Sequence, residues 1–126
     1  MRELQAALKD LTDEGLYVAR GAWMSTERDM NAPSQYVVYS TTTADALLYD
    51  DCVAMEEVEV YMNVWSDNDP TELLDNIKSR MYAAGFRRIG ETDRGYNQPR
   101  WSHMKRQHCV YLTWMYRRHV HNELIG

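Results

Sequence analysis

The sequence has few of the residues that build a large aliphatic core. Leu, Ile, Val and Phe together account for only 23 of 126 residues, and there is a single Phe. The aromatic residues are instead nine Tyr and four Trp, and eight Met accompany them. Tyr and Trp combine an apolar body with a polar tip, which suits half-buried positions and subunit contacts. The composition therefore indicates a small domain that completes its burial against copies of itself or a partner.

Cysteine and long apolar runs are also scarce, which excludes several classes of protein. The two cysteines, Cys52 and Cys109, are too few for a disulfide framework and are expected to be free thiols in a reducing cytoplasm. No apolar run approaches the roughly 18 residues that a membrane span needs. The polar start at residues 1–5 is unlike a signal peptide. We expect a soluble intracellular protein with one domain over residues 1–126 and no membrane contact.

Charges of opposite sign are segregated along the chain. The net charge of −5 argues against a dedicated nucleic-acid binder. Residues 29–75 contain eleven acidic residues and no Lys or Arg, whereas residues 76–118 contain ten basic and two acidic residues. Such segregation can produce a surface on which the acidic side of one copy meets the basic side of the next. The alternative is that the strands interleave and the charges neutralise each other within one subunit.

Two helices are predicted from apolar spacing and capping residues. Leucines recur at helical spacing over residues 2–13, which predicts an amphipathic helix. At the second helix Asp69 is expected to act as the cap, Pro70 to occupy the first turn, and Glu72 to complete a capping box. Gly85 is expected to end this helix in the left-handed conformation.

Alternation of apolar and polar residues predicts the strands and, with them, the fold class. Strands are expected at residues 16–19, 35–43, 53–66, 86–91 and 104–117. Loops are expected at residues 21–34 and 92–102, and a flexible tail at residues 119–126. The strands follow one another in hairpin-like order, which predicts an α+β fold. We expect a single antiparallel (mixed-order) sheet of four to five strands with two helices packed on one face.

No motif typical of an active site is present in the sequence. There is no glycine-rich phosphate loop, no serine elbow and no Cys/His zinc spacing. His108 and Cys109 are adjacent on a predicted strand, so they should point to opposite faces and cannot act as a base and its nucleophile. The sequence therefore predicts no catalytic residue and no cofactor.

Two loose groups of metal-ligating residue types occur in the sequence. His119 and His121 could chelate a metal together with His103 or His108, but no carboxylate or thiol lies nearby in the sequence to complete the set. The second group is a cluster of four carboxylates without EF-hand spacing, namely Asp50, Asp51, Glu56 and Glu57. Solvated side chains are the expectation for both groups, so no metal site is predicted.

Arginines and aromatic residues alternate in the second half of the chain. The stretch comprises Arg87, Arg88, Arg94, Tyr96, Arg100, Trp101, Lys105 and Arg106. It could track phosphates, but Arg87 and Arg88 should point to opposite faces of a strand, and the acidic total favours docking to protein. The residues expected at a subunit interface are Tyr61, Trp65, Arg88, Arg94, Arg106, Tyr111, Trp114 and Tyr116.

The order of these features resembles the small tail-completion, or tail-terminator, proteins at the head–tail junction of long-tailed bacteriophages and prophages. The resemblance covers roughly residues 3–117. It lies in a short first helix, an extended segment at residues 16–18, a proline before an aromatic strand at residues 33–39, a turn at residues 48–51, a strand ending in Val64-Trp65, a helix closing in Ala84-Gly85-Phe86, and a last strand with Tyr111, Trp114 and Tyr116.

The resemblance implies a structural role without enzymatic activity or cofactor. Proteins of this family assemble into a ring, commonly a hexamer, that caps the tail tube and joins it to the head. The implied partners are further copies of the chain, a tail-tube protein, a head-completion protein, and double-stranded DNA that passes through the channel without sequence-specific binding. The implied location is the neck of the virion, and the host cytoplasm during assembly.

Two other classes of function remain open from the sequence. One is a stand-alone regulatory or ligand-binding α+β domain with a pocket between helices and sheet, which would be a monomer or dimer with an apolar cavity. The other is an enzyme such as a nuclease that uses the carboxylates of Asp50, Asp51, Glu56 and Glu57. Loss of a metal-dependent activity on substitution Asp51→Ala would identify the second class.

Overall fold

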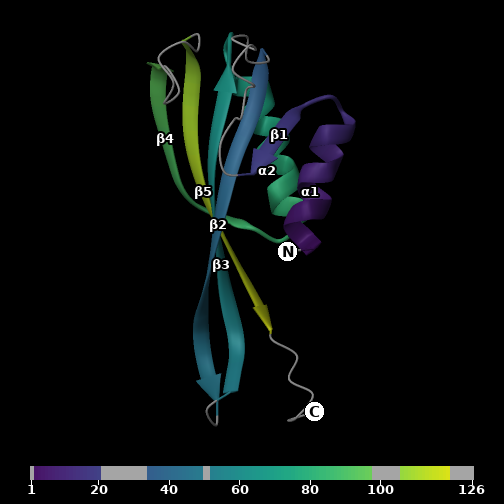
Figure 1. Ribbon diagram of the computed structural model, residues 1–126, viewed down its shortest axis with the longest axis vertical. Coiled ribbons are helices and arrows are strands. Elements are labelled where there is room, and N and C mark those ends of the chain that lie inside the picture. Colours follow the sequence, from purple (N-terminus) through teal and green to yellow (C-terminus); the bar gives the residue numbers. More distant parts are fainter. Residues whose placement is uncertain (1, 21–33, 50–51, 98–105, 120–126) are drawn as a thin grey trace.

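The chain folds into one mixed β-sheet with two helices on one side (Figure 1). The computed structural model describes residues 2–20, 34–49, 52–97 and 106–119. Its elements are α1 (Arg2–Asp13), β1 (Tyr17–Arg20), β2 (Gln35–Tyr49), β3 (Cys52–Ser66), α2 (Thr71–Ala83), β4 (Arg87–Asn97) and β5 (Gln107–His119). This confirms the α+β class and the two helices predicted on one face of the sheet.

The sheet has the strand order β1-β2-β3-β5-β4. Strands β2, β3, β5 and β4 pair with their neighbours in antiparallel fashion. The first strand departs from the expected hairpin order, because β1 pairs with β2 in parallel through Tyr17↔Tyr36 to Arg20↔Tyr39. A parallel pair needs a long connection between its strands. The connection of residues 21–33 was expected to be a loop, and it lies outside the described residues.

The core lies between the sheet and the helices. Both helices contribute an apolar stripe, from Leu4 to Leu11 in α1 and from Leu73 to Met81 in α2. The sheet supplies alternate residues of β3 and β5, which are buried because their side chains point towards the helices: Val58, Val60, Met62, Val64, Val110, Leu112 and Trp114. The alternation of the sequence thus predicted the core face of both long strands. No helix among the described residues is long and apolar enough to cross a membrane.

Helix α2 ends at the predicted glycine, but the predicted capping box does not form at its start. Gly85 has φ +95°, and the next amide, that of Phe86, donates to the carbonyl of Met81 at 3.0 Å, so α2 ends as expected. At its start the N-cap residue is Pro70, with no side-chain capping bond. The Asp69 carboxylate accepts from the amide and hydroxyl of Thr71, at 3.0 and 2.6 Å, so Asp69 caps the first turn as expected. Among the described hydrogen bonds none runs from Glu72 back to Asp69, so the predicted box is not closed.

Strands β4 and β5 both end later in the sequence than predicted. β4 continues to Asn97 through part of the expected loop at residues 92–102, because Gly95, with φ +66°, forms a bulge and does not end the strand. The Asp93 carboxylate accepts from the Gly95 amide at 2.8 Å and holds this bulge. β5 includes His119, the first residue of the expected tail, and residues 98–102 and 120–126 lie outside the described residues.

The β2–β3 hairpin is the most conspicuous departure from a two-layer body. β2 was expected to end near residue 43 but continues to Tyr49, because β3 pairs with it as far as Cys52 across a bulge between Asp45 and Leu47. Beyond the pair Thr43↔Val58 the hairpin projects past both helices, and among the described elements only the end of β5 runs beside it (Figure 1). We call residues 44–57 the arm.

Candidate subunit interface

The face of the sheet opposite the helices is the candidate interface. We call it the outer face, and it consists of the residues that alternate with the core positions. Both helices lie on the other side (Figure 1). Its central side chains are half-buried, and they are Val38, Tyr61, Asn63, Trp65, Tyr111, Thr113 and Met115. Aromatic and Met side chains with one exposed side are typical of protein contacts.

One end of the outer face carries a second hydrophobic cluster, separate from the core. Tyr36 is fully buried and stacks on Trp65 with ring centroids 6.0 Å apart and an interplanar angle of 11°. Val38 packs against the same cluster. Burial raises the pKa of Tyr36 far above its usual range of about 10. The sheet is therefore apolar on both faces at this end, as the aromatic surplus predicted.

Charged groups on the outer face are paired with aromatic residues. The Tyr61 hydroxyl donates to the Glu59 carboxylate, and this hydrogen bond is the main reason why the pKa of Tyr61 is raised. The Arg94 guanidinium lies over the Tyr111 ring, 5.0 Å from its centroid. A cation over an aromatic ring is held in place while its other side stays open to solvent or a partner. The face thus presents oriented charges on an aromatic surface.

A hollow of about 240 Å³ lies at the edge of this face, where β4 begins beside β5. It is lined by Gly85, Arg87, Met115 and Arg117. Arg117 donates to the Glu57 carboxylate at 2.8 Å, so its guanidinium is oriented. Arg87 is exposed and forms no ion pair with the described residues. Two arginines and Met115 thus line this hollow, and the exposed Arg87 can bind a carboxylate there.

The structure divides the eight predicted interface residues between several places. Tyr61, Trp65, Tyr111 and Arg94 lie together on the outer face, as the interface prediction requires. Trp114 is the clearest exception.

Trp114 was predicted at the interface but is fully buried in the core beneath α2, where the Tyr82 ring meets it edge-on at 5.4 Å. Tyr116 is also on the helix side and packs on Phe86 at 5.0 Å. The reason is strand parity, because even-numbered residues of β5 face the helices. These two residues are therefore removed from the candidate interface.

The two remaining arginines of the prediction lie near the β4 edge. Arg88 points to the helix side, opposite Arg87 as expected, and donates to the Glu91 carboxylate at 2.9 Å. Arg106 is exposed and donates to the carbonyl of Tyr96 at 3.0 Å. The expected basic stretch is thus split between two faces. Its members Arg100, Trp101 and Lys105 lie outside the described residues.

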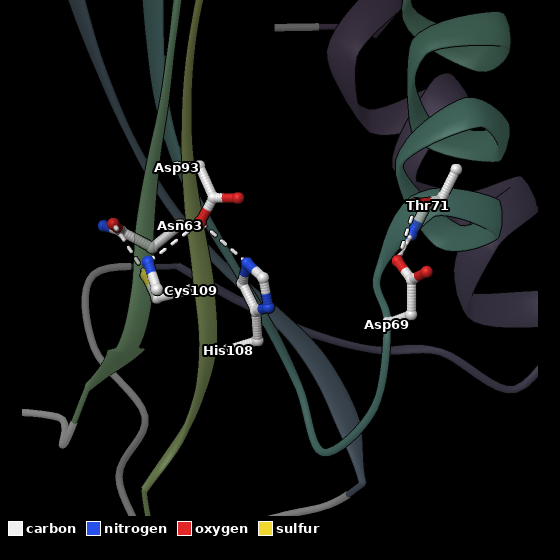
Figure 2. A network of polar contacts seen from close by, with 7 residues as sticks. Asn63, Asp69, Thr71, Asp93, His108 and Cys109 are labelled. Atoms are coloured by element: carbon white, nitrogen blue, oxygen red, sulfur yellow. Dashed lines mark hydrogen bonds and ion pairs between the residues drawn. The ribbon is translucent and has the colours of Figure 1, made fainter.

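Figure 2 shows the polar contacts around β5, and they settle the relation between His108 and Cys109. The His108 ring lies 2.7 Å from the Asp93 carboxylate on the helix side. Cys109 lies on the outer face, fully buried, with its thiol 3.7 Å from the Asn63 amide oxygen. Burial raises the pKa of the Cys109 thiol to about 11, which disfavours the thiolate. The prediction that these adjacent side chains point to opposite faces of the sheet is confirmed.

The two loose groups of metal-ligating residues are placed only in part. Within the described residues, no cluster of three or more His, Cys, Asp or Glu is arranged to hold a metal ion. Glu56 and Glu57 are each engaged by an arginine of β5, Arg118 at 2.7 Å and Arg117 at 2.8 Å. The remaining predicted ligands Asp50, Asp51, His103 and His121 lie outside the described residues, and the described backbone ends at His119.

A second hollow, of about 270 Å³, lies on the helix side where α1 ends. The residues that line it come from the end of α1, the start of β1 and β2, and α2, and include Glu14, Gln35 and Asn76. The Glu14 carboxylate accepts from the Asn76 amide at 2.9 Å and also binds Arg80. The Asn76 bond is the first reason why the pKa of Glu14 is lowered. These hydrogen bonds hold the polar side chains at the rim of the hollow in place.

Sequence reasoning missed the arm and the Arg87 hollow. The arm was hidden because Ala44 to Tyr49 carries no strict alternation, so only pairing with β3 shows that the strand continues. Arg87 was noted for its charge but was not placed at the interface, because its partner strand was not known. The register Arg87↔Met115 is what brings it beside Arg117.

No family model matches the chain, and no match was found among curated proteins.

Proposed function

We propose that this protein is a non-enzymatic structural subunit of a phage or prophage head–tail junction, similar to the tail-terminator proteins. In this role it forms a ring that caps the tail tube and connects it to the head. Its partners are further copies of itself, a tail-tube protein and a head-completion protein, and double-stranded DNA passes through the ring without sequence-specific binding. Its place is the neck of the virion, and the host cytoplasm during assembly.

The observation that carries the proposal is the outer face of the sheet. Its aromatic and Met side chains Tyr61, Trp65, Tyr111 and Met115 are only partly buried, whereas the core positions of the opposite face are buried beneath the two helices. Large partly exposed aromatic surfaces on a small domain mark sites of protein association. The arm supports the same conclusion, because it projects from the body as a second contact element (Figure 1). A ring requires two different contact surfaces on each subunit.

The experiment is mass photometry of the purified protein, alone and mixed with a tail-tube preparation. We expect a closed oligomer or a complex with the ends of the tubes. Raising the salt concentration should weaken assembly, because the contacts join surfaces of opposite charge. A monomer at every concentration that also fails to bind tail tubes would contradict the proposal.

A stand-alone regulatory or ligand-binding domain is the second candidate, and one observation favours it. The hollow near Glu14 has a volume of about 270 Å³ and polar groups at its rim, which is close to the lower limit of small-molecule sites. This role predicts a monomer or dimer whose melting temperature rises with a small ligand. The same mass photometry separates the two candidates by oligomeric state.

A further inference from the structure

The outer face is organised in rows that cross three neighbouring strands. β5 lies in the middle, between β3 and β4, so each outward-pointing residue of β5 has one partner on either side. Counted from the arm, the rows are Glu59↔Met115↔Arg87, Tyr61↔Thr113↔Gly90, Asn63↔Tyr111↔Thr92 and Trp65↔Cys109↔Gly95. Each row therefore shows which residues β3 and β4 hold at equal distances from β5.

The two outer members of a row are complementary in charge or in size. In the first row, Glu59 of β3 is acidic and Arg87 of β4 is basic. In the second row, Tyr61 of β3 corresponds to Gly90 of β4, and the last row repeats this combination with a tryptophan and a glycine. At the level of each large ring on one side of β5, the other side of β5 thus carries no side chain.

Gly90 is a glycine that the fold of its own subunit does not require. It follows the bulge at Ile89, but unlike Gly95 it does not have a positive φ angle. A Cβ added at Gly90 would lie 3.5 Å from Oγ1 of Thr113, which is ordinary contact on the outer face. Glycine inside a strand weakens the strand and often marks a place where another molecule approaches closely. Gly90 therefore leaves room on the outer face for a second molecule.

Two charged residues of these rows form no ion pair with the described residues of their own subunit. Arg87 is exposed, and Glu59 is half-buried and accepts a hydrogen bond from a tyrosine hydroxyl. The other charged groups on this face are engaged, because Glu57 binds Arg117 at 2.8 Å and Arg94 lies over an aromatic ring. A carboxylate that accepts one hydrogen bond still has acceptor sites left. Glu59 and Arg87 are therefore the charges that can bind across a contact.

We infer that the outer face binds the outer face of a second copy of this chain, about a twofold axis that runs along β5. This axis places β3 of each copy over β4 of the other and keeps every residue at its level along the strands. Glu59 then lies opposite Arg87 of the second copy, and Tyr61 enters the space over Gly90 of that copy. Met115 meets its own counterpart near the axis. Packed sheets lie about 10 Å apart with nearly aligned strands, and a Glu and an Arg side chain together span this distance.

This contact goes beyond the proposed function. A ring contact joins two different surfaces, whereas a twofold contact joins one surface to itself and is complete with two copies. Both helices lie on the opposite side of the sheet and leave the outer face accessible (Figure 1). The contact therefore belongs to the free protein, and it covers the partly exposed aromatic rings until a tail tube is present.

The substitution Gly90→Val tests the space that the second copy needs. The subunit has room for the added Cβ, and valine suits a strand, so the melting temperature of the monomer should not fall. In the dimer the new side chain would occupy the place of Tyr61 from the other copy. Sedimentation velocity over a range of concentrations should show a dimer for the wild type and a monomer for the variant.

An exchange of charges tests the twofold arrangement itself. In a symmetric dimer, Glu59→Arg or Arg87→Glu places like charges opposite each other twice, so each variant alone should dimerise at least about tenfold more weakly than the wild type. An equimolar mixture of the two variants should dimerise again, because both opposed pairs then carry opposite charges. The matched control is Lys9→Glu, at an exposed position of α1, which should dimerise like the wild type. Circular dichroism verifies that each variant is folded.

Three results would overturn the inference. They are a wild-type protein that stays monomeric at every concentration, a Gly90→Val variant that dimerises like the wild type, and a mixture of folded charge variants that stays monomeric. A wild-type dimer that does not bind tail tubes supports this contact and contradicts the proposed function. A monomer that binds the tubes rejects this contact alone.

Discussion

At the scale of single residues, Glu91 joins the second helix to the edge of the sheet. Its carboxylate lies 2.6 Å from the Lys78 ammonium and 2.9 Å from the Arg88 guanidinium. The Lys78 hydrogen bond is the first reason why the pKa of Glu91 falls below its ordinary value of 4.5. A carboxyl group whose pKa is lower in the folded state stabilises the fold above its unfolded pKa, and this contribution is lost as pH falls through the folded pKa.

We therefore expect the free energy of unfolding to decrease as the pH falls below about 4.5. The carboxyl groups of Asp93, Asp69 and Glu14 contribute in the same direction, because their pKa values are also lowered. The variant Glu91→Gln should be less stable near neutral pH and should lose less on acidification. Urea unfolding across this pH range measures both effects. Equal acid sensitivity in the variant and the wild type would show that Glu91 contributes nothing.

The turn after α2 depends on Gly85 for two reasons that a pair of variants can separate. Gly85 has φ +95°, and a Cβ added there would lie 3.0 Å from Cε2 of Tyr116. Gly15 has a similar φ of +98° but open space around it. We expect Gly15→Ala to cost about 1–2 kcal/mol through backbone strain alone. Gly85→Ala should cost more in the same urea titration, and equal costs would show that the Tyr116 ring moves freely.

Trp114 has a buried indole N–H that finds no hydrogen-bond partner among the residues that the structure describes. An unsatisfied buried donor carries a desolvation cost of about 1–3 kcal/mol. Truncation by Trp114→Ala removes a large core side chain and should cost about 3–5 kcal/mol. Trp114→Phe removes the donor as well as some volume, so its cost in a thermal or urea melt should be less than half as large. A similar cost for both substitutions would mean that the indole N–H is satisfied after all.

At the scale of elements, the arm should contribute little to the stability of the isolated subunit. It projects past the helices, and the buried positions among the described side chains of β3 lie between Val58 and Ser66. Replacing residues 46–55 by Asn-Gly should therefore leave the melting temperature of the monomer close to that of a wild-type monomer. A large drop, measured below the concentration at which the wild type assembles, would mean that the arm is part of the core.

The elements also show how far local sequence patterns determine this fold. Strict alternation predicted the faces of β3 and β5, and glycine predicted the end of α2, because both signals act within a few residues. The extension of β2 to Tyr49 and of β4 to Asn97 depends on pairing with a neighbouring strand. Such pairing joins residues far apart in the sequence, and local patterns do not contain it.

The residues of the candidate interface were likewise predicted only in part, because strand register decides where their side chains lie. Tyr61, Trp65 and Tyr111 were predicted from aromatic content and lie on the outer face. Trp114 was assigned to the interface on the same ground, although its even position in β5 places it in the core. Arg87 was missed because its position beside Met115 and Arg117 depends on the register of β4 against β5. Residue type indicated the kind of surface, and register decided which residues belong to it.

At the scale of the whole molecule, the charge segregation has a partial structural explanation. Arg117 and Arg118 neutralise Glu57 and Glu56 at the base of the arm, so the strands do interleave there. The exposed Arg87 forms no ion pair with the described residues, and the charged residues in the sequence from 45 to 55 are all acidic. Neutralisation within one subunit is thus observed at the base of the arm, and complementarity between copies stays a prediction. The uncompensated part is the part we assign to contacts between subunits.

We propose that the outer face and the arm mediate the assembly of subunits. The most direct test of this proposal is mass photometry of the wild-type protein over a range of concentrations, alone and with tail tubes. The account predicts a closed oligomer, or its formation on the ends of the tubes, that dissociates as the salt concentration rises. A monomer that is independent of concentration, unaffected by salt and unable to bind tail tubes would contradict it.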